Sequence, residues 1–123
     1  MLKHVSHVEV YVSDLDRSIP FYRDKLGLRL AFHAVDHGWA EFETDGAILA
    51  LSQPPAEQNA LRAQVGGYTG VVFSVEDCEA ECKELSGRGV TFTVPPRKEP
   101  WGGTLAVFQD PDQNKIYIVS RQK

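Results

Sequence analysis

Two side chains capable of acid–base chemistry stand close together near the N-terminus. His7 and Glu9 are two residues apart in a segment of alternating character, so on a strand they share one face. A carboxylate beside an imidazole can poise a proton near neutral pH, which makes the pair a candidate for general acid–base catalysis. The alternative is a structural role, in which His7 is hydrogen-bonded inside a cleft to Glu9 or to Tyr117.

Other histidine and glutamate side chains offer a second chemistry, the binding of a divalent metal. Together with His7 and Glu9, a His/Glu site could draw on two further strand-like segments, which carry His33, His37, Glu41 and Glu43. A catalytic divalent ion typically needs three protein ligands. We expect instead that His37, like His4, is exposed to solvent and that His33 lies at a sheet edge.

The two cysteines are more typical of a core than of a reactive site. Cys78 and Cys82 are four residues apart and form, with Leu85, an apolar stripe on one face of a helix. No further metal ligands stand near them, and free cysteine is among the most buried residue types. We therefore predict two reduced, buried thiols. Reduced thiols and an N-terminus without a secretory signal predict a cytoplasmic protein.

Composition excludes several classes of protein. The chain has 123 residues, 42% hydrophobic and 24% charged, which is typical of one globular domain. No apolar run approaches the ~20 residues needed to cross a bilayer. The 13 basic and 17 acidic residues form no basic stripe, so neither a nucleic acid nor a membrane is expected as partner. All of the excess negative charge lies in residues 1–60, which favours a neutral or cationic small molecule.

An internal repeat determines the predicted architecture. Residues 8–16 and 71–79 share a strand that alternates with period 2 and ends at an acidic helix cap, at an offset of 63 residues. In each half a helix and three further strands follow. The helices are expected at 14–26 and 77–86, and the strands at 28–35, 38–44, 47–52, 90–94, 103–109 and 115–120. Pro20 suggests that the first helix opens irregularly and becomes regular near Ser18.

These elements predict an α+β protein made of two βαβββ modules. Residues 3–122 would form one domain, with module 3–52, linker 53–68 and module 69–121. The eight strands are expected to form a mixed sheet that lines a cleft, with the helices on the outside. The sequence leaves open whether the modules pair within one chain or swap across a dimer.

Strand alternation assigns side chains to the two faces of each sheet. One face should pack under the helices; it carries Val8, Val10, Val12, Val71, Phe73 and Val75. The opposite face carries His7, Glu9, Tyr11, Gly70, Val72 and Ser74. A concave polar face sheltered by strands is typical of a ligand cleft.

Two stretches give the chain a resemblance to a known family. Residues 7–28 (HVEVYVSDLDRSIPFYRDKLGL) resemble the opening strand and helix of the vicinal-oxygen-chelate superfamily. Residues 100–103 (PWGG) and 108–116 (FQDPDQNKI) resemble its closing hairpin. The superfamily includes glyoxalases, bleomycin-resistance proteins and extradiol dioxygenases, and the resemblance covers about residues 3–122.

The resemblance also implies a set of metal-ligand positions on four strands. The first falls on His7, which could serve. The others fall on Ala50 (or on Leu49, with the register shifted by one), on Gly70 and on Tyr117. Ala50 and Gly70 cannot coordinate, and Tyr117 replaces the expected glutamate. We therefore predict no cofactor, the alternative being a divalent metal held through His7.

The resulting prediction is a metal-independent small-molecule-binding protein that resembles the antibiotic-sequestering members of the family. Its ligand is expected to be aromatic or cationic and to lie at a homodimer interface, with Phe32 and Glu43 as further contacts. The predicted ligand-binding residues are His7, Glu9, Tyr11, Trp39, Glu41, Ala50, Gly70, Trp101 and Tyr117. Each tryptophan has an alternative role in packing, and Trp101 could simply anchor its hairpin. The alternative function is a metal-dependent lyase, isomerase or dioxygenase with a rearranged His/Glu site, for which His7 and Glu9 are the catalytic candidates.

Overall fold

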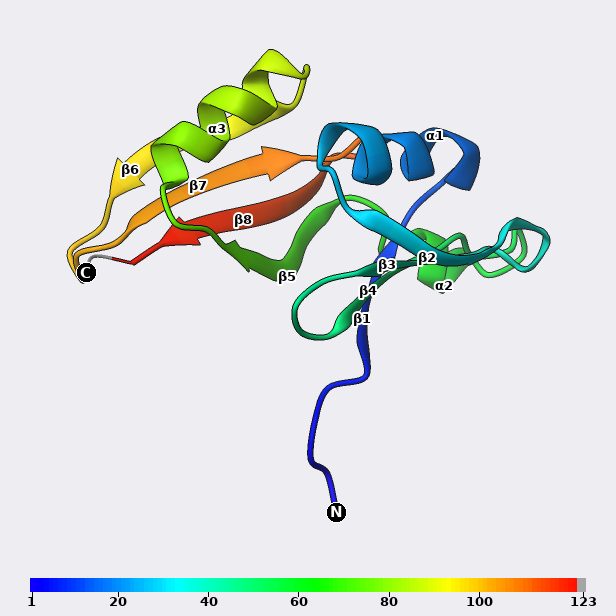
Figure 1. Cartoon of the computed structure of the whole chain (residues 1–123). Coiled ribbons are helices and arrows are strands. Elements are labelled where there is room, and N and C mark those ends of the chain that lie inside the picture. Colours follow the sequence, from blue (N-terminus) through cyan, green and yellow to red (C-terminus); the bar gives the residue numbers. More distant parts are fainter. Residues whose placement is uncertain (122–123) are drawn as a thin grey trace. The chain divides into compact units, whose positions relative to one another are not determined.

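Each half of the chain folds into a four-stranded mixed sheet with its own helix. The computed structural model describes residues 1–121, and the chain divides into two units between Gly66 and Gly67 (Figure 1). The first unit contains β1 (His7–Tyr11), α1 (Leu15–Pro20), η1 (Phe21–Lys25), β2 (Arg29–Ala34), η2 (Val35–His37), β3 (Trp39–Glu43), β4 (Ile48–Ser52) and α2 (Asn59–Arg62). The second contains β5 (Gly67–Ser74), α3 (Cys78–Gly87), β6 (Thr91–Lys98), β7 (Thr104–Gln109) and β8 (Asn114–Ser120). The predicted α+β class and the two βαβββ modules are confirmed.

The two sheets have the same topology. Their strand orders are β1-β4-β3-β2 and β5-β8-β7-β6, with one parallel pair in each, β1 with β4 and β5 with β8. Within residues 1–121 the eight strands are thus divided equally between two sheets rather than joined in one. A parallel pair cannot be closed by a tight turn, so each module places its helix in the connection that follows its first strand.

Strand register shows that the repeat extends into the packed faces. In the first sheet Leu51 pairs with Val10 and with Ala40, and in the second Ile118 pairs with Phe73 and with Ala106. Ala40, Leu51, Ala106 and Ile118 are all at most 2% exposed. Equivalent positions therefore build the two cores.

The predicted burial of Val8 is wrong. Val10 and Val12 are 2% and 0% exposed, but Val8 is 38% exposed. Residues 1–9 are all exposed, so the covered part of β1 begins only at Val10.

The first helix differs from its predicted form because of Pro20. Asp14 caps an α-helix that begins at Leu15, earlier than the predicted start near Ser18, and its side chain accepts a hydrogen bond from the backbone N–H of Asp16. Pro20 has no N–H to donate to the carbonyl four residues earlier, and beyond it the chain continues as the π-helix η1. The ring of Tyr22 in η1 then packs 5.8 Å from that of Phe42, which fixes the helical segment on the sheet.

The second helix and its cysteines follow the prediction. Asp77 caps α3 by accepting a hydrogen bond from the backbone N–H of Ala80. Cys78 and Cys82 are free thiols, 1% and 4% exposed, with their Sγ atoms 3.9 Å apart. Burial raises the pKa of both thiols, that of Cys82 to about 12. Both are therefore protonated at neutral pH and unsuited to nucleophilic chemistry.

Strand β6 is longer than predicted because it tolerates two prolines. It continues past the predicted end at residue 94, through Pro95 and Pro96, to Lys98. Proline removes a backbone donor from the ladder, and β6 is an edge strand whose pairing is irregular between Val94 and Arg97.

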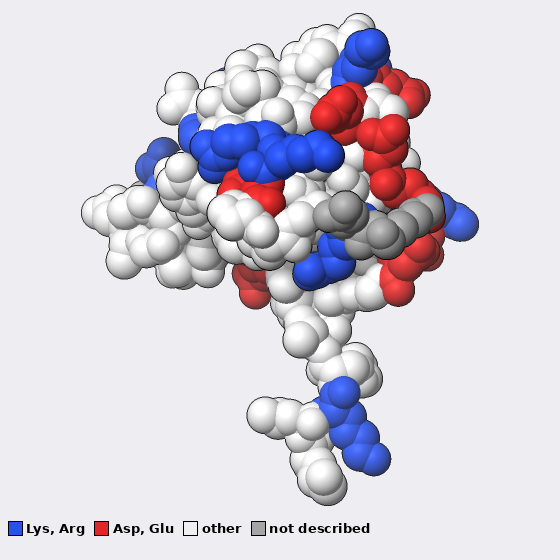
Figure 2. Space-filling model, turned by 90° about the vertical axis from the view of Figure 1, so that its left-hand side faces the viewer, with Lys and Arg blue, Asp and Glu red and all other residues white. Residues whose placement is uncertain are grey.

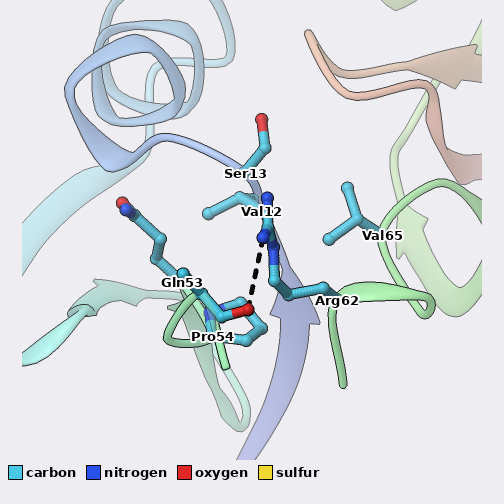
Figure 3. A pocket seen from close by; sticks show the side chains of 7 residues that line it. Val12, Ser13, Gln53, Pro54, Arg62 and Val65 are labelled. Carbon is cyan, nitrogen blue, oxygen red and sulfur yellow. Dashed lines mark hydrogen bonds between the residues drawn. The ribbon is translucent and has the colours of Figure 1, made fainter. Parts of the chain in front are cut away.

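The segment between the modules is more ordered than a simple linker. The side-chain oxygen of Gln53 accepts a hydrogen bond from the backbone N–H of Leu15 at 2.8 Å, and the backbone N–H of Gln53 donates to the carbonyl of Gly38. After Pro54 and Pro55 the chain forms α2, whose Arg62 donates a hydrogen bond to the carbonyl of Ala56 (Figure 3). These contacts attach the segment to the first unit.

Two surface properties bear on the predicted partners. Among residues 1–121, no helix has the length and apolar character that crossing a membrane requires. The face in Figure 2 carries both basic and acidic side chains among a larger neutral surface, with no broad basic area.

Candidate functional site

The predicted site residues fall on both units, and each group is described on its own sheet. In the first sheet Ala50 pairs with Glu9 on one side and with Glu41 on the other. We call Glu9, Ala50 and Glu41 the central row of the first sheet. Its equivalent in the second sheet is Val72, Tyr117 and Val107, because Tyr117 pairs with Val72 and with Val107 in the same way.

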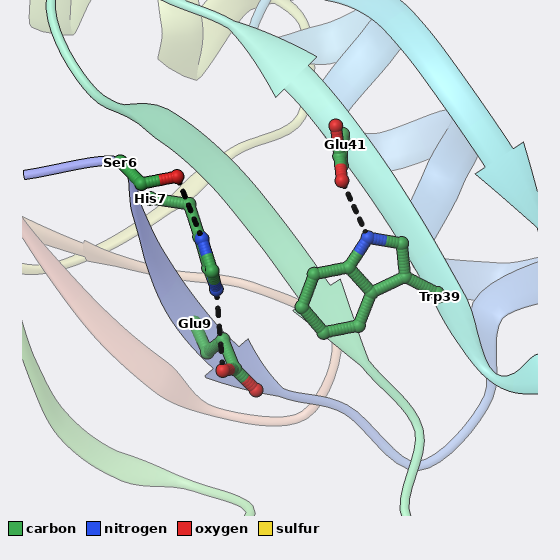
Figure 4. Close-up of polar contacts among 5 residues, drawn as sticks. All are labelled: Ser6, His7, Glu9, Trp39 and Glu41. Carbon is green, nitrogen blue, oxygen red and sulfur yellow. Dashed lines mark hydrogen bonds and ion pairs between the residues drawn. The ribbon is translucent and has the colours of Figure 1, made fainter.

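The central row of the first sheet belongs to a network of polar contacts (Figure 4). His7 Nε2 lies 3.4 Å from Glu9 Oε2, and His7 Nδ1 lies 3.3 Å from the hydroxyl of Ser6. The indole N–H of Trp39 donates to Glu41 Oε2 at 2.7 Å. The rings of His7 and Trp39 pack edge to face, with their centroids 5.5 Å apart. This contact links the His7–Glu9 pair to the Trp39–Glu41 pair.

This network places two carboxylates and two rings on one sheet face, beside solvent. The side chains of His7 and Glu9 are 38% and 39% exposed. A contact of 3.4 Å at this exposure is a weak interaction, worth at most about 1 kcal/mol. The arrangement is better suited to attracting a cation to the ring faces and carboxylates.

The donor set does not fit the metal that the resemblance implies. No group of three histidine, cysteine, aspartate or glutamate side chains within residues 1–121 is arranged to hold a metal ion. Among the residues of the alternative His/Glu site, Glu43 lies 3.4 Å from Arg29, and His33 and His37 are exposed.

Ala50 occupies the middle of its row and is 0% exposed. Its methyl group offers no ligand atom, and the longer side chains on either side belong to Glu9 and Glu41. A bound molecule would therefore meet the two carboxylates rather than the methyl group.

Gly70 stands at a bulge in β5, which sequence reasoning did not foresee. The pairing of β5 with β8 shifts between Tyr68 and Val72, and the Thr69 hydroxyl replaces ladder bonds by donating to the carbonyl of Lys115 and accepting from the N–H of Val71. Gly70 has φ +80°, a conformation that costs a residue with a Cβ roughly 1–2 kcal/mol. A Cβ at this position would meet no atom within 4 Å, so backbone conformation, and not lack of space, favours glycine.

Tyr117 is positioned by the turn that precedes β8. The carboxylate of Asp110 accepts hydrogen bonds from the backbone N–H groups of Asp112 and Asn114 and from the side-chain amide of Asn114. This buried network explains the Asp-Pro-Asp motif as a structural turn. The ring of Tyr117 lies 5.9 Å from that of Tyr68, an aromatic residue that the prediction left inside the linker. The second module is predicted to start at residue 69, whereas β5 starts two residues earlier, at Gly67, and so includes Tyr68.

Trp101 packs against its own hairpin. A Cβ at Gly103 would lie 1.8 Å from the Trp101 ring, so the glycine gives the indole room to lie flat on the backbone. Arg121 Cζ lies 5.7 Å from the centre of the same ring. The contacts match the anchoring role considered for Trp101, although the side chain is 54% exposed.

Comparisons with known proteins agree with this geometry. The model of the Glyoxalase/Bleomycin resistance protein/Dioxygenase superfamily matches residues 4–118. A glutathione transferase FosA from Serratia marcescens is 33% identical over 120 residues, covering 96% of this chain and 81% of that protein. A superfamily member from Sphaerobacter thermophilus superposes with a TM-score of 0.85 at 32% identity, covering 98% and 99% of the two chains. TnmS3, an antibiotic binding protein from Streptomyces sp. CB03234, has a TM-score of 0.77 and 29% identity over 98% of each chain.

Proposed function

Because the chain belongs to the Glyoxalase/Bleomycin resistance protein/Dioxygenase superfamily, we propose that it binds a small aromatic or cationic molecule without the help of a metal. The main support is the central row of the first sheet, where two carboxylates flank Ala50 and one of them is hydrogen-bonded to Trp39. A carboxylate held against an indole favours a flat cation, which interacts with both the charge and the ring face. The similarity to TnmS3, an antibiotic binding protein, supports a binding role.

Independence from metal is supported by the chemistry of the residues at the family's ligand positions. His7 offers an imidazole, but Ala50 offers a methyl group and Gly70 no side chain. Gly70 also lies in a bulge whose φ of +80° disfavours any other residue. Tyr117, which corresponds in the second sheet to Ala50 in the first, offers a phenol hydroxyl in place of the expected carboxylate.

On the second unit, Tyr117 and Tyr68 offer a pair of rings that could stack on a flat ligand. We propose these rings as a separate stacking surface on the second unit, with Trp101 as a further contact there; on the first unit Tyr11 is proposed as a further contact beside the central row. We further propose that the protein is a homodimer, since each sheet ends in edge strands that are open to pairing. We also propose a cytoplasmic location, because both cysteines are free thiols and the cytoplasm keeps thiols reduced.

The second candidate is an enzyme of the same superfamily that holds a divalent metal through His7. It is favoured by the 33% identity to a protein named as a glutathione transferase. A metal there would supply a Lewis acid, and on this chain His7 would be its ligand and Glu9 the neighbouring base.

Metal analysis and ligand titration together separate the two candidates. We would purify the protein without a histidine tag, measure bound zinc, nickel, iron and manganese, and then titrate benzyltrimethylammonium while following tryptophan fluorescence. A Trp101→Phe variant leaves Trp39 as the reporter. Binding of the cation by metal-free protein, with weaker binding of neutral benzyl alcohol, is the expected result. Stoichiometric metal that a chelator removes together with several degrees of thermal stability would overturn the proposal.

A further inference from the structure

A cavity lies just past the C-terminal end of β1, whereas His7 stands at the first residue of that strand. Its volume is about 180 Å³, well above the roughly 30 Å³ that a water molecule occupies in the liquid. It is lined by Val12, Ser13, Gln53, Pro54, Arg62 and Val65, all from the first unit (Figure 3). His7, Glu9, Trp39 and Glu41 do not line it.

Arg62 and Gln53 supply hydrogen-bond donors at this cavity. Within residues 1–121 the Arg62 guanidinium makes one long hydrogen bond, from Nη1 to the carbonyl of Ala56 at 3.4 Å, and no ion pair. Since a guanidinium has five N–H donors, most of its capacity is left for a ligand.

Gln53 adds a further donor. Its side-chain oxygen accepts from the backbone N–H of Leu15 at 2.8 Å, which leaves the amide NH₂ as the remaining polar group. The hydroxyl of Ser13 accepts from Arg17 at 3.4 Å, so a second guanidinium stands beside the cavity. No aspartate or glutamate lines the cavity, although residues 1–60 carry an excess of acidic residues.

The rest of the wall is apolar. Val12 and Pro54 are buried, and Val65 is half-buried. An Arg guanidinium matches a carboxylate with two parallel hydrogen bonds, and apolar walls favour a short hydrocarbon body.

From this arrangement we propose that the cavity is a binding site for a small organic monocarboxylate. Its carboxylate pairs with Arg62, and its aliphatic part lies against Val12, Pro54 and Val65. The site is separate from the proposed aromatic or cationic ligand, because it has the opposite charge preference and different residues.

The test is a titration of the ¹⁵N-labelled protein with butyrate and with its neutral isostere butyramide. Butyrate is expected to cause saturable shifts of the backbone amides of Val12, Ser13 and Val65, and butyramide to cause far smaller ones. Equal shifts from the two compounds would show an apolar cavity without a carboxylate site and would overturn the proposal. Butyrate shifts scattered over the surface would overturn it as well.

Variants of Arg62 locate the charge that is responsible. Arg62→Gln should weaken butyrate binding about tenfold or more, the range expected for loss of a charged hydrogen bond. Arg62→Lys keeps the charge but loses the planar fork, so its affinity should be intermediate. Arg29→Gln is the matched control, because it removes the same charge from a side chain that is 81% exposed on the same unit. Unchanged binding in Arg62→Gln would contradict the proposal, and if that variant fails to fold, Arg62→Lys and the butyramide comparison still decide it.

Discussion

The two sheets repeat their buried faces and differ on the opposite ones. On the buried side Phe42 and Leu49 pair in the first sheet as Phe108 and Ile116 do in the second. On the other side the central row of the first sheet has two carboxylates around a methyl group, and its equivalent has two valines around a phenol. The buried cores thus meet the same packing constraint in both modules. The chemical difference between the modules lies on the opposite sheet faces, where the residues of the two rows differ.

The helices extend this comparison. At the 63-residue offset Leu15 corresponds to Cys78 and Ile19 to Cys82, and all four side chains are buried. The thiols therefore stand where the first module has aliphatic core residues, which accounts for both cysteines without a redox or metal role.

The largest effect is expected on stability, from substitutions in the two equivalent cores. Phe42→Ala and Phe108→Ala each remove a ring that is at most 1% exposed, and each should lower the free energy of unfolding by about 3–5 kcal/mol. Urea denaturation of both variants measures this. A large loss in one variant and almost none in the other would show that the two cores are not equivalent.

The next test separates the exposed faces of the two modules. Trp39→Ala should weaken binding of benzyltrimethylammonium by about 1–3 kcal/mol, because the variant removes a ring held beside a carboxylate. Trp101→Ala should have much less effect, since Arg121 already stands over that ring. Calorimetric titration measures both variants, since Trp39→Ala removes the fluorescent reporter. Tyr117→Ala, measured in the same way, shows whether the second module contributes; the reverse order of the two tryptophan effects would refute the assignment.

A third test isolates the bulge in β5. Gly70→Ala should cost about 1–2 kcal/mol through backbone strain alone, because φ is +80° and a Cβ meets no neighbour. Gly87→Ala is the control: its Cβ also meets no neighbour, but its φ is not positive. Thermal melting of the two variants gives the comparison, and equal stability would mean that β5 pairs without the bulge.

A smaller effect, confined to alkaline pH, is expected from the buried thiols. The pKa of Cys82 is raised from 9.0 to about 12 by burial, so the native state retains a proton that the unfolded state loses. The stabilising contribution is complete below pH 9 and declines as the pH rises toward 12. The unfolding free energy of the wild type should therefore fall more steeply over this range than that of Cys82→Ala. Parallel curves, or two fast-reacting thiols in native protein, would be inconsistent with this burial.

The smallest effect is expected at His7. His7→Ala should change the free energy of unfolding by less than about 1 kcal/mol, because the side chain is exposed and its ion pair with Glu9 is weak. The melting temperatures of the wild type and the variant should also be insensitive to a chelator. If a chelator destabilises only the wild type, a metal is bound through His7.

The sequence was sufficient for the parts of the fold that rest on periodicity. The alternation of Val10 and Phe73 with polar residues, and the acidic caps Asp14 and Asp77, predicted both strand–helix units. Periodicity could not predict the π-helix after Pro20 or the proline-containing end of β6. Both depend on neighbouring residues that compensate for the backbone N–H that proline lacks.

The candidate site was predictable only in part, for a related reason. Alternation placed His7 and Glu9 on one face, and they do make contact. The hydrogen bond from Trp39 to Glu41 joins residues two apart on one strand, but nothing local indicates which rotamer the indole adopts. The cavity around Arg62 depends on how residues 53–66 fold back on the end of β1. No periodic sequence pattern predicts that arrangement.

The bulge at Gly70 also limits how this protein can change by mutation. A histidine in place of Gly70 would stand on a backbone whose φ disfavours side chains by about 1–2 kcal/mol, beside a ladder whose bonds are replaced by Thr69. The same strain applies to any side chain placed at this position, whether or not it can coordinate a metal. A substitution at Gly70 is therefore better tolerated when Thr69, which holds the bulge, is changed with it.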